Sequence, residues 1–109
     1  MGRPKLHGER VRIQMRSSVI LITFATDEAG NADTDRNSWI VEQLARLSKR
    51  GLPAKMKTDA ALQAIGGTRA DLTIDVPVDV SERIDRRSEE WEIPRSTWIN
   101  LALASVMGG

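Results

Sequence analysis

Three arginines and a glutamine stand at alternate positions near the start of the chain, at Arg10, Arg12, Gln14 and Arg16. Arginine donates paired hydrogen bonds to the edge of guanine, and glutamine can contact adenine in the same way. Alternate residues of a strand project from one face, so these four side chains can meet one ligand surface. The pattern predicts a surface that reads base edges in a nucleic-acid groove. The alternative is a solvated basic edge strand, since charges on edges also prevent aggregation.

Aliphatic residues alternate with these polar ones, which predicts a half-buried strand over residues 10–16. A second alternating stretch, around 71–76, predicts another strand. The apolar side chains expected in the core are Val11, Ile13 and Met15 in the first strand and Leu72, Ile74 and Val76 in the second. The polar side chains of the second strand are Thr73 and Asp75, with Asp71 nearby. Aspartate accepts from cytosine but repels phosphate, so we expect the first strand to supply most of the recognition.

Helices are predicted between and after these strands from apolar spacing and caps. One begins at a cap on Thr34 or Asp35 and ends near Lys49; another covers about 81–92. Pro94 suits the first turn of a last helix that ends at about 106 or 107. The residues of these helices expected in the core are Ile40 and Leu44 in the first, Ile84 in the second, and Ile99 and Leu103 in the third.

The stretch that follows the first strand is ambiguous. Val19 to Phe24 is rich in β-branched residues, which favours a strand. Ser17 and Ser18 can instead cap a helix that Gly30 ends. Local sequence leaves both interpretations open.

The order strand, helix, helix occurs twice in these predictions. Residues 35–40 align with 94–99 at an offset of 59, which brings Trp39 onto Trp98. The aliphatic positions of the strands align at an offset of 61, which makes the second copy two residues tighter. Such a repeat implies a helix at 18–29. The alternative to a repeat is chance similarity between two amphipathic helices. The helical spacing of both tryptophans predicts packing in the core or at an interface rather than base stacking.

These features resemble the ribbon-helix-helix proteins, the Arc and MetJ group whose β-ribbons read DNA. The resemblance rests on the alternating first strand, a helix, and a second helix that opens with Arg-polar-polar-Trp-Ile, at 36–40. Family members normally dimerise, pairing two strands over four interlocked helices. With both copies on one chain, the resemblance implies a mostly α fold with a short two-stranded antiparallel β-ribbon, closed as a single-chain pseudo-dimer. The other arrangement pairs the first strand with that of another chain.

The resemblance also implies the organisation of the chain and its phosphate contacts. The expected segments are a basic arm at 1–9, one copy at 10–50, a linker at 51–70 with room for a short helix near 58–65, and a second copy at 71–107. In the family, the first turn of each second helix holds a phosphate, as helix N-termini do generally. The expected phosphate-binding residues are Arg36 and Asn37, Arg95 and Ser96, and Arg3 and Lys5 of the arm. Ordinary helix capping and an inert tail are the alternatives.

Charge is distributed unevenly along the chain, although the net charge is only +1. Residues 1–16 contain five Lys or Arg against one acid, a balance of +4, and residues 71–109 contain four Arg against eight acids, a balance of −4. One end of the chain is therefore expected to meet a polyanion.

The composition limits the remaining functions. The 109 residues include no cysteine and one histidine, which excludes disulfides and thiolate metal sites. The sequence contains no catalytic triad spacing or phosphate-binding glycine loop, so we expect neither an enzyme, nor a cofactor, nor a small-molecule substrate. With no apolar run of membrane-span length and no apolar signal core, we expect a cytoplasmic protein without a membrane partner.

Double-stranded DNA is the expected partner. The last helix is apolar nearly all round, so it is either central to the core or a contact through which DNA-bound molecules associate further. The resemblance implies a sequence-specific transcriptional repressor or autoregulator, or a plasmid transfer or segregation accessory protein at an origin. A different class is an antitoxin-like protein-binding module. The chain ends about where the last helix ends, which argues against the usual disordered neutralising tail. An adaptor without DNA binding is a fourth interpretation.

Overall fold

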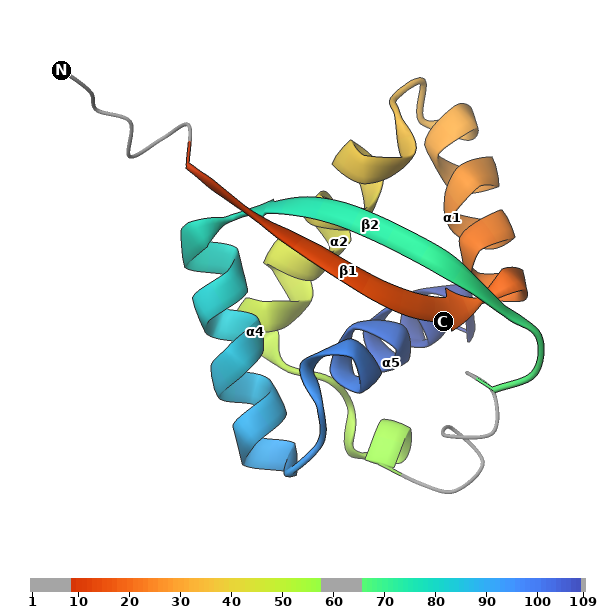
Figure 1. The fold of residues 1–109 in the computed structure, drawn as a ribbon. Helices are drawn as coiled ribbons and strands as arrows, with labels where there is room; N and C mark the ends of the chain where they lie inside the picture. Colours follow the sequence, from red (N-terminus) through yellow and green to blue (C-terminus); the bar gives the residue numbers. More distant parts are fainter. Residues whose placement is uncertain (1–8, 58–65, 109) are drawn as a thin grey trace, which may run out of the picture.

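A computed structural model describes residues 9–57 and 66–108, with a two-stranded antiparallel sheet packed on α-helices (Figure 1). The elements in chain order are β1 (Arg10–Ser18), α1 (Val19–Asn31), α2 (Arg36–Arg50), the 3-10 helix η1 (Ala54–Lys57), β2 (Arg69–Pro77), α4 (Val78–Trp91) and α5 (Arg95–Gly108). The expected mostly helical fold with one short antiparallel β-ribbon is confirmed. Arg3, Lys5 and the short helix expected near 58–65 lie outside the described residues.

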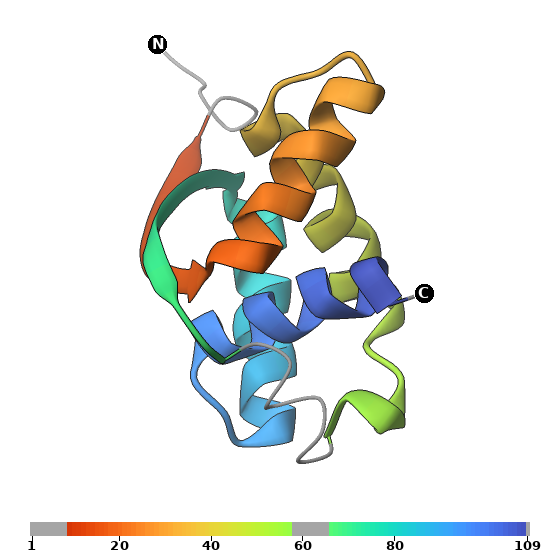
Figure 2. The same ribbon diagram turned by 90° about the vertical axis from the view of Figure 1, so that its right-hand side faces the viewer.

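Strands β1 and β2 pair over their whole length, from Arg10 opposite Pro77 to Ser18 opposite Arg69. We call this pair the ribbon. The inward side chains Ile13, Met15, Leu72, Ile74 and Val76 are buried, and Val11 packs against them half-buried. Figure 2 shows the helices together on one side of the ribbon, so the inward side chains meet the helices and the outer face remains open.

A single offset relates the two halves of the chain. Equivalent elements begin 59 residues apart, at Arg10 and Arg69, Val19 and Val78, and Arg36 and Arg95. The offset of 61 expected for the strands is therefore wrong. It matched the aliphatic runs, whereas the last inward position of β1 is the buried Ser17, which stands where β2 has Val76. Because Ser17 is polar, the aliphatic pattern of β1 ends one inward position early and aligns two residues out of step with β2.

Helix α1 settles the ambiguous stretch in favour of a helix. The hydroxyl of Ser18 caps it by accepting a hydrogen bond from the backbone N–H of Ile20 at 3.2 Å. The buried residues Leu21, Ala25 and Ala29 recur at every fourth position, which is the helical period. The strand interpretation is wrong because this packing overrides the β-propensity of the branched residues. The helix also continues past Gly30 to Asn31.

Two other helix starts differ from the sequence predictions. Helix α4 begins at Val78, not near 81, because β2 leads directly into it through Pro77. Helix α5 begins at Arg95, and Pro94 lies just outside it, where its carbonyl accepts from the N–H of Trp98 at 3.1 Å. Proline fits both places because neither requires a backbone N–H donor.

Both repeated tryptophans lie in the core, as their spacing predicts. Trp39 is 6% exposed and meets Phe24 edge to face, with ring centroids 5.7 Å apart, and Trp98 is fully buried. The other helical residues expected in the core, Ile40, Leu44, Ile84, Ile99 and Leu103, are also fully buried.

A buried polar contact joins β1 to α5. The hydroxyl of Ser17 donates to Oδ1 of Asn100, and Nδ2 of Asn100 donates to the carbonyl of Arg16 at 3.2 Å. At the offset of 59, the equivalents of Ser17 and Asn100 are Val76 and Val41. One half of the molecule thus has a hydrogen-bonded pair where the other half has two valines.

We predict that Asn100→Val lowers the free energy of unfolding by about 1–3 kcal/mol, because it leaves the buried Ser17 hydroxyl without an acceptor. Adding Ser17→Val should restore part of that loss, since it removes the stranded hydroxyl. Urea unfolding of the wild type, both single variants and the double variant measures the coupling. A double variant less stable than Asn100→Val alone would contradict this account of the pair.

Candidate nucleic-acid interface

The outer face of the ribbon carries the side chains predicted to read bases. Arg10, Arg12, Gln14 and Arg16 are exposed along β1, and Asp71 and Thr73 are exposed along β2, whereas Asp75 is half-buried. Alternation along each strand puts all of them on the side away from the helices. The structure therefore brings the predicted residues of both strands onto one open surface (Figure 2).

Each of two arginines on β1 faces an aspartate on β2. Nε of Arg12 lies 3.1 Å from Oδ1 of Asp75, and Nε of Arg16 lies 3.6 Å from Oδ1 of Asp71. Gln14 is opposite Thr73 between the two ion pairs. At the offset of 59, Gln14 and Thr73 are themselves equivalent, so the pairing is centred on them. The two ion pairs are then equivalents of each other on either side of this centre.

The ion pairs hold the arginines along the ribbon without burying them. The hydrogen bond from Arg12 to Asp75, and then the carboxylate charge, raise the pKa of Arg12. The side chains of Arg12 and Asp75 remain 67% and 42% exposed. Ion pairs between exposed side chains are weak and screened by salt. The guanidinium groups can therefore exchange these contacts for contacts to a ligand.

The charges on the outer face favour pairing between unlike strands. If β1 paired with a second β1 in the same register, Arg12 would lie opposite Arg16, and a pair of β2 strands would bring Asp71 opposite Asp75. Like charges directly opposite each other in a ribbon are destabilising, and opposite charges are stabilising. The charge pattern thus selects the β1–β2 pair that the structure contains.

The first turn of α2 is tied to the ribbon. Nδ2 of Asn37 donates to the carbonyl of Asp75 at 3.2 Å, and Oδ1 of Asn37 accepts from the N–H of Asp75 at 2.9 Å. The carboxylate of Asp35 accepts from the N–H of Ser38 at 2.7 Å. Arg36 is exposed beside them. A carboxylate therefore already occupies the helix start at which a phosphate was expected, and the Asn37 amide positions β2.

The first turn of α5 differs from that of α2 in its capping. Pro94, which precedes it, has no side-chain acceptor to occupy the backbone N–H groups, in contrast to Asp35 before α2. Arg95 is partly exposed and lies 3.7 Å from Asp85, and Ser96 is half-buried. In Figure 1 the first turns of α2 and α5 lie beyond opposite edges of the ribbon, although both helices are on the same face of it (Figure 2). The two helix starts predicted to hold phosphate therefore differ in the groups that surround them.

Arg69 also belongs to the outer face, although the alternation over 71–76 did not include it. At the offset of 59 it is the equivalent of Arg10, and it is exposed at the start of β2. Its carbonyl accepts a hydrogen bond from Arg16 at 3.2 Å. An offset of 61 does not align Arg69 with Arg10. The offset of 59 between the repeated helices, applied to the strands, does align them.

Comparison with protein-family models, with curated proteins and with solved structures finds no match to this chain. Within residues 9–57 and 66–108, no helix is both long and apolar enough to cross a membrane. In the same residues, no three His, Cys, Asp or Glu side chains gather where they could hold a metal ion. The outer face of the ribbon is therefore interpreted from its own geometry and charge.

We predict that Asp35→Asn removes part of the acid sensitivity of the fold. Hydrogen bonds from the backbone N–H and then the hydroxyl of Ser38 lower the pKa of Asp35. Its ionised form therefore stabilises the fold above about pH 4, the pKa of an unfolded aspartate, and this stabilisation is lost as the pH falls through the lower folded pKa.

Denaturant unfolding across a pH series measures the effect. The free energy of unfolding should fall more steeply for the wild type than for Asp35→Asn as the pH drops below about 4. Parallel curves for the two proteins over this range would show that Asp35 does not cap α2 in solution.

Proposed function

We propose that this protein binds double-stranded DNA sequence-specifically by inserting the ribbon into the major groove, and that it acts as a transcriptional repressor or autoregulator. The observation that carries the proposal is the outer face of the ribbon, where Arg10, Arg12, Gln14 and Arg16 are exposed together. A major groove about 12 Å wide admits a two-stranded ribbon, and arginine and glutamine have the donors and acceptors that its base edges require.

We further propose that the chain is a single-chain pseudo-dimer of the ribbon-helix-helix type. The repeated order of strand and two helices, with one constant offset of 59, supports it. The strand register supports it as well, because an approximate twofold axis would relate Gln14 to Thr73, and these two residues are paired. A pseudo-dimer needs no second chain to present two strands to DNA.

The two halves of the proposed binding surface differ in charge, which predicts an asymmetric DNA site. β1 presents Arg12 and Arg16 where β2 presents Asp71 and Asp75. Arginine suits guanine, whereas aspartate accepts from cytosine and repels phosphate. The half-site under β1 is therefore expected to contribute more affinity than the half-site under β2.

Selection of bound duplexes from a random pool tests the proposal, with the mass of each complex measured by light scattering. We expect one chain on one site without palindromic symmetry, and a steep loss of affinity between about 50 and 200 mM salt. Failure to bind any duplex at low salt would refute DNA binding and leave an interaction module. The genomic position of the selected site would then distinguish a repressor from a plasmid transfer or segregation protein.

We predict that Arg12→Ala and Gln14→Ala each cost about 1–3 kcal/mol of binding free energy at the selected site, if each side chain makes a bidentate base contact. The loss on random duplex should be much smaller. Arg86→Ala is the matched control, because Arg86 is an exposed arginine on α4 rather than on the ribbon. Equal losses on selected and random DNA would reduce Arg12 and Gln14 to backbone contacts.

Asp75→Ala should have the opposite effect in the same measurements of DNA affinity. Removing the carboxylate frees Arg12 and removes repulsion of phosphate, and the contacts of Asn37 to the Asp75 backbone are retained. Affinity should therefore stay unchanged or rise. A large loss would instead make Asp75 a base reader or a residue that orients Arg12 for binding.

A further inference from the structure

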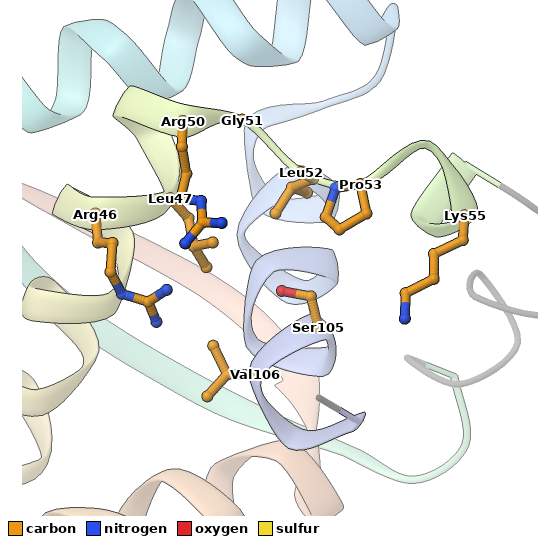
Figure 3. Close-up of a pocket in the computed structure, with 9 residues that line it drawn as sticks. All are labelled: Arg46, Leu47, Arg50, Gly51, Leu52, Pro53, Lys55, Ser105 and Val106. Carbon is orange, nitrogen blue, oxygen red and sulfur yellow. The ribbon is translucent and has the colours of Figure 1, made fainter.

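A hollow of about 650 Å³ lies between the end of α2, the segment that follows it and the last turn of α5. Figure 2 shows these segments on the side of the molecule away from the ribbon. Its walls combine apolar side chains with three cations, and the residues that line it are Arg46, Leu47, Arg50, Gly51, Leu52, Pro53, Lys55, Ser105 and Val106 (Figure 3).

The turn at the end of α2 brings the residues that follow it to the wall of this hollow. Gly51 ends α2 with a φ of 82°, a left-handed value that favours glycine, and its N–H donates to the Leu47 carbonyl at 2.7 Å. This turn directs Leu52 and Pro53 back toward α5, so that they face Ser105 and Val106 across the hollow (Figure 3).

Positive charge gathers at this hollow. Among the residues that the structure describes, no aspartate or glutamate lines it, and positions 43–57 contain five Lys or Arg and no acid. Arg46 donates to the neutral side chain of Gln43. Figure 3 shows the guanidinium groups of Arg46 and Arg50 on one side of Ser105 and the ammonium group of Lys55 on the other.

Stabilisation of a helix end explains only part of this charge. Lys49 and Arg50 lie in the last turn of α2, where cations interact favourably with the helix dipole. Arg46 stands one turn earlier, outside the range of that effect. Its position beside apolar walls therefore needs another explanation.

We propose that this hollow binds a small amphipathic anion, with its carboxylate or phosphate group at Arg46 and Arg50 and its apolar body against Leu47, Leu52 and Val106. A volume of this size suits a small molecule, and a few charged groups in apolar walls fix the orientation of such ligands. A duplex backbone would use the cations but not the apolar walls. The site is separate from the ribbon, so this inference goes beyond DNA binding and does not depend on it.

Titration of the full-length ¹⁵N-labelled protein, followed by amide chemical shifts, tests the proposal with three probes. Octanoate combines an anionic group with an apolar chain, octylammonium has the same chain with the opposite charge, and inorganic phosphate is an anion without a chain. Octanoate should give saturable shifts centred on Leu47, Leu52 and Val106, and the other two probes should bind much more weakly.

Two variants locate the charge that matters. Arg46→Gln combined with Arg50→Gln should weaken octanoate binding about tenfold or more, since charged hydrogen bonds to the anion are lost. Arg86→Gln, an exposed arginine on α4, should leave binding unchanged. The dispersion of the amide spectrum shows whether each variant remains folded.

Four results would overturn the proposal. The first is the absence of saturable shifts with octanoate, and the second is equally tight binding of octylammonium or phosphate. The third is octanoate binding that survives the loss of Arg46 and Arg50, and the fourth is displacement of octanoate by duplex DNA. The last would identify a surface for nucleic-acid phosphates. The first three results do not bear on recognition by the ribbon, because the hollow lies on another side of the molecule (Figure 2).

Discussion

The pairing of β1 with β2 is the constraint on which the rest of this structure depends. It buries alternate aliphatic residues of both strands against the helices and leaves the polar residues on one open face. The outer charges make this pairing selective, since Arg12 meets Asp75 and Arg16 meets Asp71, whereas pairs of like strands would oppose like charges. The same carboxylates that define the pairing also make the two halves of the face chemically unequal.

Sequence reasoning reached the features that local chemistry determines. The alternation at 10–16 fixes which side of β1 is buried, and Asp35 caps α2 as expected. It missed features that depend on contacts distant in sequence. Ser17 follows Met15 at the next inward position, but its type does not indicate burial, because its partner Asn100 lies 83 residues away. The ion pairs of Arg12 and Arg16 depend on the strand register, which no pattern within either strand defines.

The proposed functions use separate parts of the same scaffold. The ribbon presents arginines that exposed ion pairs hold in place, and such pairs can open when a stronger ligand arrives. Asn37 and Asn100 fix the helices to the strand backbones at Asp75 and Arg16, so the surface is supported from behind. Away from the ribbon, the cationic hollow between α2 and α5 offers an anion site. DNA binding and small-anion binding can therefore be altered independently by substitution.

The central claim is that one chain closes its own ribbon, with Gln14 opposite Thr73 at the centre. The chain contains no cysteine, so Gln14→Cys with Thr73→Cys introduces the only thiols, on the outer face where the core is undisturbed. Side chains directly opposite in an antiparallel pair are close enough for a disulfide. After mild oxidation, a non-reducing gel and intact mass should show a single chain with an internal disulfide and no free thiol. Disulfide-linked dimers as the main product would contradict the account.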